Sequence, residues 1–286
     1  MPELPEVETI AMGLHKRVAG DRIETVWIGR KPEPLKSRPA EIARALEGAR
    51  IERVRRVGKH IVFDLNGNSA EAAVQGSRDL QGALVSRIEV EWIVHLGMTG
   101  RMVVADPALE PAKHTHLVAR LDSGRELRFI DPRRFGRLEV RREEFKGPGA
   151  EPLTITVEDF ARLFHRSKAP IKAALLNQKL LAGVGNIYAD ESLFRAGIRP
   201  RRRAHTLTRD ELNKLHAGVQ QVLKEAIAAG GSSVSDYVDA GGEEGFFQLQ
   251  HRAYGREGEP CLVCQTPIKK IVVAGRGTHY CPRCQK

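Results

Sequence analysis

Apolar positions near the start of the chain recur at the spacing of a helix. Val7, Ile10, Ala11, Leu14 and Val18 follow the i, i+3, i+4, i+7 pattern, so they share one helical face. The positions between them are mostly polar or charged. The pattern therefore predicts a helix over roughly residues 4–19 with one buried stripe.

Beyond residue 20 the pattern changes to short apolar runs typical of strands. Gly and Asp-Ser-Gly turns separate several of these runs, which are rich in Val, Ile, Leu and Phe. They lie near residues 22–30, 50–57, 60–65, 91–96, 101–105, 116–121, 125–131 and 136–141. We expect an antiparallel β-sandwich or flattened barrel that includes one short helix at 41–47. Residues 67–90 form a long polar stretch to which we assign no function.

The second half of the chain has helical spacing. A Gly/Pro break, GPGAEP, lies at 147–152, and Thr154 or Thr156 can cap a helix over 157–165. Further helices are expected at 172–176, at 186–195 and in a long segment that ends at Gly230-Gly231. From about residue 251, short strands and turns surround four cysteines. The prediction is an α+β fold with domains at 1–148, 149–250 and 251–286.

Composition is consistent with this division. The chain has 286 residues, of which 41% are hydrophobic, enough for more than one core. No uninterrupted apolar run could span a bilayer, and the acidic start does not resemble a secretory leader. We expect a soluble, cytoplasmic protein with no membrane association.

Charge favours a polyanionic partner. Lys and Arg total 46 against 36 Asp and Glu, a formal net charge of +10 at pH 7. A generally basic soluble protein is the alternative interpretation. Basic groups also cluster near turns, which is typical of phosphate contacts. The clusters are Arg53, Arg55, Arg56 and Lys59; Arg133, Arg134 and Arg137; and Arg201, Arg202 and Arg203.

The cysteines have the spacing of a metal site. Cys261 and Cys264 form one Cys-x-x-Cys pair, and Cys281 and Cys284 form a second pair after an interval of sixteen residues. Four thiolates in this arrangement can close a tetrahedral structural zinc site. Disulfides would need an oxidising compartment, and a redox Cys-x-x-Cys pair usually lies in a βαβ unit, which is missing. The pattern predicts one structural Zn²⁺.

The stretch LAGVGN at 181–186 indicates a tight turn before a helix. Gly183 and Gly185 bracket the turn, and Asn186 opens the helix. Backbone N–H groups at a helix N-terminus can bind a phosphate, and Lys172 lies one short helix upstream. The arrangement resembles a helix–two-turn–helix DNA-binding element. A plain helical hairpin is the alternative interpretation.

Two turns carry apolar residues that could enter a duplex. HLGMTG at 95–100 places Met98 between strands, and DPRRFG at 131–136 places Phe135 beside Arg133. Enzymes that act on a base extrude it, and Met, Phe and Arg are side chains that can fill the space left behind. Core packing is the commoner fate of a single Met or Phe.

The first ten residues, MPELPEVETI, allow two interpretations. Proline and acidic residues are common in the first turn of a helix. Alternatively, removal of Met1 would leave Pro2 with a free secondary amine beside Glu3 and Glu6, which is what an imine-forming enzyme needs.

Taken together, these motifs resemble the formamidopyrimidine-DNA glycosylase family. The matching stretches are MPELPEVET at 1–9, GKH at 58–60, HLGMTG at 95–100, DPRRFG at 131–136, LLAGVGNIYADESLF at 180–194, YGREGEPC at 254–261 and the paired Cys-x-x-Cys. They cover nearly the whole chain in order. Leu4 favours the purine branch, because the endonuclease VIII-like branch typically has glycine there.

The resemblance implies a role for each matching residue. Pro2 would be the nucleophile, Glu3 the general acid/base and Glu6 a supporting residue, while Lys59 would lie near the damaged nucleotide and act in catalysis. Residues 232–238 would close over the extruded base. The DNA-binding residues would be His95, Met98, Arg133, Phe135, Lys172, Asn186 and Arg276, with Arg133 facing the orphaned cytosine.

The implied activity is that of a bifunctional glycosylase and AP lyase, a monomer that excises oxidised purines from double-stranded damaged DNA. Two departures from the family affect the lesion contacts: the 67–90 stretch is longer than expected, and Ser235 stands where a basic residue often occurs. Three alternatives remain: an endonuclease VIII-like enzyme for oxidised pyrimidines, a non-enzymatic DNA-binding protein, and an RNA-binding protein.

Overall fold

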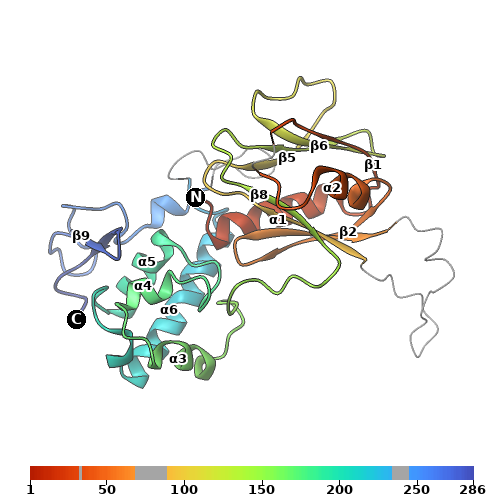
Figure 1. Cartoon of the computed structure of the whole chain (residues 1–286). Coiled ribbons are helices and arrows are strands. Elements are labelled where there is room, and N and C mark those ends of the chain that lie inside the picture. The colour runs from red at the N-terminus through yellow and green to blue at the C-terminus, as the bar shows by residue number, and fades with distance from the viewer. Residues whose placement is uncertain (32–33, 68–88, 234–244) are drawn as a thin grey trace. The chain divides into compact units, whose positions relative to one another are not determined.

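The computed structural model describes residues 1–31, 34–67, 89–233 and 245–286 (Figure 1). These residues form two compact units. The first contains residues 1–2 and the described residues between 7 and 146, and the second contains residues 3–6, 147–233 and 245–286. The three-domain division expected from the sequence stays a prediction.

The first unit is built on two four-stranded antiparallel sheets. One has the order β1-β6-β7-β5, with β1 at Ile23–Ile28, β6 at Thr115–Leu121, β7 at Glu126–Ile130 and β5 at Arg101–Ala105. The other has the order β2-β3-β4-β8, with β2 at Arg50–Val57, β3 at His60–Asn66, β4 at Val90–His95 and β8 at Arg137–Arg141. Inward side chains of both sheets join one apolar core, which includes Phe63, Trp92, Leu117 and Phe129. This is the expected β-sandwich.

Two helices add apolar side chains to that core. The amphipathic stripe of α1 (Leu4–Val18) buries Val7, Ile10, Leu14 and Val18 in it, as the spacing predicts. The short α2 (Pro39–Leu46) adds Ile42 and Leu46. Leu4 differs, because it belongs to the apolar core of the second unit. The first turn of α1 is therefore part of the second unit.

The second unit is helical. It contains α3 (Val157–His165), α4 (Ile171–Leu175), α5 (Asn186–Ala196), α6 (Arg209–Ala228) and the 3-10 turns η2 (Ala204–Thr206) and η3 (Phe247–Gln250). Thr156, rather than Thr154, caps α3 by accepting a hydrogen bond from Asp159 N at 3.1 Å. Strands β9 (Lys269–Val273) and β10 (Arg276–Tyr280) form a hairpin between the two cysteine pairs.

The expected α+β class and helix–strand order are confirmed, with boundaries that differ by a few residues. Residues 68–88, most of the polar stretch expected to interrupt two strands, lie outside the described residues, as do residues 234–238 of the expected closing loop. Among the described residues, no helix is both long and apolar enough to cross a membrane.

Candidate active site and nucleic-acid interface

The first turn of α1 lies against the GVGN turn of the second unit. Leu4 N donates to the Gly183 carbonyl at 3.0 Å, and the Glu3 carboxylate accepts a hydrogen bond from Ile187 N at 3.2 Å. Ile187 lies in the first turn of α5, so the positive end of that helix faces the carboxylate. The sequence predicts a phosphate at this helix N-terminus, whereas the structure places the Glu3 carboxylate there.

Two glycines make this approach possible. Gly183 has a φ of +90°, and a Cβ there would lie 2.7 Å from the Leu4 side chain. A Cβ at Gly185 would lie 2.2 Å from Cδ of Glu3. Gln178 fixes the turn through two hydrogen bonds. Its Oε1 accepts from Gly183 N, and its Nε2 donates to the Val184 carbonyl. Gln178 is a supporting residue that the sequence analysis did not identify.

Glu6 is buried and serves as an acceptor for three donors. Its Oε2 accepts from Glu3 N at 2.8 Å, and its Oε1 accepts from Ser232 N at 2.8 Å and from the Tyr188 hydroxyl. Burial raises the pKa of Glu6 above its ordinary value, although these hydrogen bonds oppose the shift. Because one of the donors is the amide that joins Pro2 to Glu3, Glu6 orients the start of the chain.

Asp131 ties together the two turns predicted to enter a duplex. Its Oδ1 accepts from the Thr99 hydroxyl at 2.7 Å, and its Oδ2 accepts from Gly136 N at 2.7 Å. Gly97, with a φ of +62°, leaves no room for a Cβ, which would lie 2.5 Å from the Phe135 carbonyl carbon. The HLGMTG and DPRRFG turns are therefore adjacent in the first unit. Asp131 is a further supporting residue that the sequence pattern does not single out.

The side chains at these tips are exposed. Met98 is 46% exposed and Phe135 is 52% exposed. The Arg133 guanidinium lies 4.8 Å from the centre of the Phe135 ring, a cation–π contact. Neither side chain is buried in the core, so both are available to a partner. The core-packing alternative therefore does not hold for these two residues.

Other predicted residues of the first unit lie near strand ends. Lys59 follows Gly58 in the turn between β2 and β3 and is only 7% exposed. His95 ends β4, and its Nδ1 accepts from Gly97 N at 3.1 Å. Burial first, then nearby basic groups, lowers the pKa of His95 to about 4. The ring is therefore neutral at pH 7 and holds the turn that carries Met98.

Lys172 has no exposed surface and anchors the second hairpin. Its Nζ donates to the Gly277 carbonyl at 2.9 Å and to the Thr278 hydroxyl at 2.8 Å, and it lies 2.7 Å from Asp190. Asn186 Nδ2 donates to the same Gly277 carbonyl at 3.0 Å. Burial lowers the pKa of Lys172, and Asp190 opposes that shift. Both residues thus hold the backbone beside Arg276, which is itself exposed.

Two adjacent acids of α5 complete this anchoring. Asp190 Oδ2 accepts from His279 N at 2.8 Å in β10. Glu191 accepts from the backbone N–H groups of Arg252, Ala253 and Tyr254, which begin the zinc-finger segment. Neither acid is singled out by the sequence, because the backbone N–H groups that each one binds lie at least 61 residues away along the chain.

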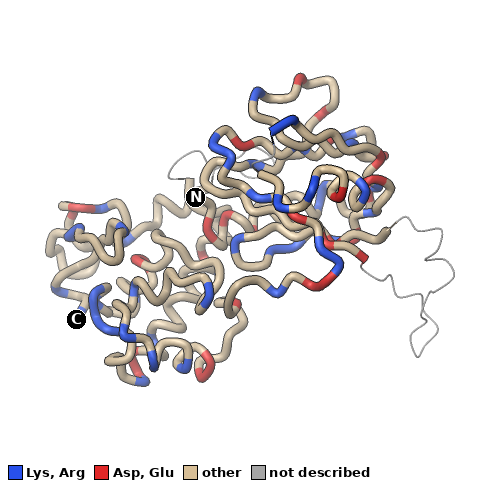
Figure 2. Tube along the Cα trace, in the orientation of Figure 1, with Lys and Arg blue, Asp and Glu red and all other residues tan. Residues whose placement is uncertain are grey.

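Lys and Arg occur in both units rather than in one tail (Figure 2), but several have structural partners. Arg53 and Arg55 pair with Asp64, Arg56 pairs with Glu8, and Arg202 pairs with Glu211. The sequence pattern predicts phosphate contacts for the clusters at 53–59 and 201–203. The structure shows that these members hold their own units together.

The four cysteines form a compact cluster. Their Sγ atoms all lie within 4.8 Å of one another, with Cys264 and Cys281 at 3.4 Å and Cys261 and Cys284 at 3.9 Å. A tetrahedral site with Zn–S bonds of about 2.3 Å separates its sulfurs by about 3.8 Å. Backbone N–H groups of Val263 and Cys284 point to Cys261 and Cys281 sulfurs. The cluster therefore fits a four-thiolate zinc.

The family models that match the β-sandwich and the helical part place the chain in the class of DNA glycosylases. The chain matches three family models in order: the formamidopyrimidine-DNA glycosylase N-terminal domain at 1–138, its H2TH domain at 147–238, and a zinc finger found in FPG and IleRS at 258–286. This chain belongs to the formamidopyrimidine-DNA glycosylase family, as its motifs predict.

Relatives cover the full chain. It is 44% identical to a formamidopyrimidine-DNA glycosylase of Solibacter usitatus and 43% identical to one of Desulfitobacterium hafniense, each over 100% of both chains. The crystal structure of the Thermus thermophilus MutM (Fpg) protein matches with a TM-score of 0.82 at 42% identity, over 99% of this chain and 98% of that chain. A complex of Lactococcus lactis Fpg with abasic-site DNA matches with a TM-score of 0.85 at 32% identity, over 99% of both chains.

Proposed function

We propose that this chain excises oxidised purines, 8-oxoguanine and formamidopyrimidines, from double-stranded DNA and then cleaves the strand as an AP lyase. Pro2 is the nucleophile, through a Schiff base, after Met1 is removed. The observation that carries the proposal is the buried start of α1. Glu3, just before the helix, lies at the N-terminus of α5, and Glu6 accepts from the Pro2–Glu3 peptide. Family membership supports the same assignment.

A terminal amine suits this step. An α-amino group titrates near about 7.7–8.0, so roughly a tenth to a fifth is unprotonated at neutral pH, whereas a lysine is mostly charged. Attack of the Pro2 nitrogen on C1′ of the deoxynucleoside breaks the bond from C1′ to the base, which leaves with a proton. Glu3 then protonates the sugar ring oxygen as the ring opens to an iminium.

The iminium drives strand cleavage because it is a cationic electron sink. It acidifies C2′, so removal of a C2′ proton expels the 3′ phosphate in a β-elimination. A further δ-elimination expels the 5′ phosphate and leaves a one-nucleotide gap with phosphate at both ends. Glu3 transfers the protons of these eliminations, and Glu6 keeps the Pro2–Glu3 backbone in position. Lys59 acts near the damaged nucleotide and its phosphate.

The remaining predicted residues bind DNA. Met98, Arg133 and Phe135 fill the space left by the extruded nucleotide, on two turns that Asp131 holds together. His95 supports the Met98 turn. Arg276 contacts a backbone phosphate, and Lys172 and Asn186 position Arg276 by holding the neighbouring Gly277 carbonyl.

Zinc completes the second unit. Cys261, Cys264, Cys281 and Cys284 would hold one structural Zn²⁺, which supplies folding energy and leaves no open position for catalysis. We place the protein in the bacterial cytoplasm as a monomer acting on chromosomal DNA. An endonuclease VIII-like activity on oxidised pyrimidines is the alternative, which the buried Leu4 disfavours.

Borohydride trapping tests the proposal. The reductant should convert the iminium into a covalent protein–DNA adduct on an 8-oxoguanine:cytosine duplex. Glu3→Gln should lower the trapping rate by at least about 100-fold, the usual contribution of a general acid. Pro2→Gly should lower it less, because a primary amine remains. Glu8→Gln, on the same helix but paired with Arg56, is the matched control and should trap normally.

Substrate competition separates the two branches. Preferential trapping on a thymine-glycol duplex would assign the chain to the pyrimidine branch. Tight binding to lesion DNA with no adduct and no nick would contradict the enzymatic proposal altogether.

A further inference from the structure

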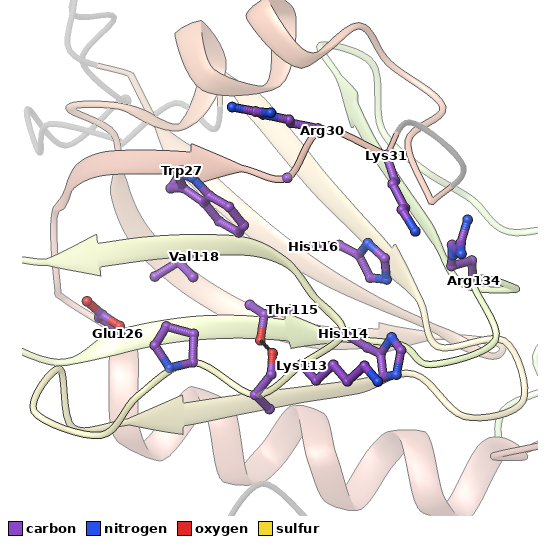
Figure 3. Close-up of a pocket in the computed structure, with 13 residues that line it drawn as sticks. Trp27, Arg30, Lys31, Lys113, His114, Thr115, His116, Val118, Glu126 and Arg134 are labelled. Carbon is purple, nitrogen blue, oxygen red and sulfur yellow. Dashed lines mark hydrogen bonds between the residues drawn. The ribbon is translucent and has the colours of Figure 1, made fainter.

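A cavity of about 710 Å³ opens on the outer face of the β1–β6–β7–β5 sheet, away from the core of the first unit (Figure 3). Trp27 and Val118 form part of its lining, and they pair across β1 and β6. Their neighbours Ile28 and Leu117 point the other way, into the apolar core. Side chains alternate along strands, so this face is directed to solvent. The proposed reaction does not use the cavity.

Trp27 is unusual on such a face. It is 54% exposed, whereas the other tryptophan of the chain, Trp92, is fully buried. Gly29 continues β1 by donating to the His116 carbonyl at 2.9 Å, and a Cβ there would lie 3.5 Å from the Trp27 ring. The indole therefore lies along the strand and presents a flat apolar surface inside a concave site, which suits a planar ligand.

The rim of the cavity is positively charged. Arg30, Lys31 and Lys113 line it, and within the described part of the chain none of them forms an ion pair. The acid in the lining, Glu126, is already paired with buried Arg128 at 2.7 Å. The uncompensated charge is therefore cationic, and it selects for an anion.

Two hydrogen-bond acceptors also line the cavity, on His116 and Thr115 (Figure 3). His116 Nε2 donates to the Asp131 carbonyl at 2.9 Å, which leaves Nδ1 as the acceptor nitrogen of the ring. The Thr115 hydroxyl donates to the Ala112 carbonyl at 2.7 Å, which leaves its lone pairs as acceptors. Both residues line the cavity. Such acceptors match the exocyclic amine of a base.

We propose that this cavity is a second nucleotide-binding site, separate from the site of base excision. The heterocycle stacks on Trp27, and the phosphate is held by the cationic rim, to which Lys113 belongs. Stacking on an aromatic side chain and a cationic contact to phosphate are together the recognition chemistry of an unpaired nucleotide. The nucleotide could be free or could be the unpaired end of a strand.

Anisotropy of a fluorescently labelled deoxyguanosine monophosphate, with the full-length protein, tests the site. We expect saturable binding that Trp27→Ala weakens at least about tenfold and Trp27→Phe weakens little, since phenylalanine keeps a stacking face. Lys113→Ala should weaken binding similarly. Lys224→Ala, an exposed charge on α6, is the matched control. Borohydride trapping should be unchanged in all four variants, which shows that they remain folded.

Competitors define the ligand and its source. Unlabelled deoxyguanosine and inorganic phosphate should each compete at least about tenfold more weakly than the monophosphate, because each offers half of the contacts. A duplex with a one-nucleotide overhang that competes better than the blunt duplex would assign the source to DNA ends; equal competition would assign it to free nucleotides. Absence of saturable binding, or equal binding by Trp27→Ala and the unaltered protein, would overturn the proposal.

Discussion

At the scale of single residues, the contact between Glu3 and Gly185 explains why two distant motifs are both needed. The carboxylate of Glu3 reaches Ile187 N only because residue 185 has no side chain. The sequence predicts Glu3 as a catalytic residue and the GVGN turn as a phosphate-binding turn. It could not show that the two belong together, because that contact depends on how the chain folds.

Gly185→Ala should therefore impair catalysis through Glu3. The new methyl group would lie 2.2 Å from Glu3 Cδ, so the carboxylate must move. We expect the borohydride trapping rate to fall at least about tenfold, within the range by which general acids act. Affinity for lesion DNA, measured without reductant, should change less than about threefold, since no DNA-binding residue is displaced.

A matched substitution separates this effect from general damage. Gly29→Ala adds the same methyl group where the nearest atoms lie at 3.5 Å, an ordinary contact distance. It should trap at the normal rate. Normal trapping by Gly185→Ala would mean that the position of Glu3 at the α5 N-terminus does not matter for the reaction.

At the scale of elements, helices α4 and α5 hold the β10 end of the zinc-finger hairpin through a buried ion pair. Lys172 and Asp190 lie 2.7 Å apart with no exposed surface, and together they bind Gly277, Thr278 and His279. Removing one partner of a buried pair leaves an uncompensated charge and typically costs about 3–5 kcal/mol. The hairpin that carries Arg276 should then lose its fixed position.

Asp190→Asn should consequently weaken DNA binding, although it removes a negative charge from a protein that binds a polyanion. We expect about a tenfold loss of affinity for lesion duplexes, similar to that of Lys172→Met. Titrations at several salt concentrations measure it. Glu257→Gln, an exposed acid of the same unit, is the control and should bind equally well or slightly more tightly. Tighter binding by Asp190→Asn would show that Lys172 and Asp190 act by charge alone.

The helices and strands were easier to predict than the side-chain contacts between them. Alternation and helical spacing located the strands of the sandwich and α1, α5 and α6, because these patterns arise within each segment. The role of Arg53 and Arg55 could not be predicted from such local patterns. Their cationic run resembles a phosphate-binding strip, but Asp64 on the neighbouring strand β3 neutralises it through cross-strand pairing. Such pairing depends on register, which local patterns do not encode.

At the scale of the whole molecule, the chain has two large apolar cores, one in each unit, and only the second unit carries the cysteine cluster. Both tryptophans, Trp27 and Trp92, belong to the first unit. Intrinsic tryptophan fluorescence therefore reports the unfolding of the first unit, and chelation of the proposed zinc would act on the second unit. The unfolding of the first unit and the effect of zinc removal on the second unit can be followed separately in one sample.

Removing zinc should thus destabilise the second unit and leave the first unit largely unaffected. Four-thiolate zinc supplies about 10–16 kcal/mol to small zinc-finger peptides, so its loss should unfold the segment around Cys261 and Cys284. We expect a strong chelator to abolish tight DNA binding and to increase amide hydrogen exchange in β9 and β10, while the denaturant midpoint of tryptophan fluorescence shifts little. Cys284→Ser should reproduce the effect without chelator. An equal shift of the tryptophan midpoint would show that the two cores unfold as one cooperative body.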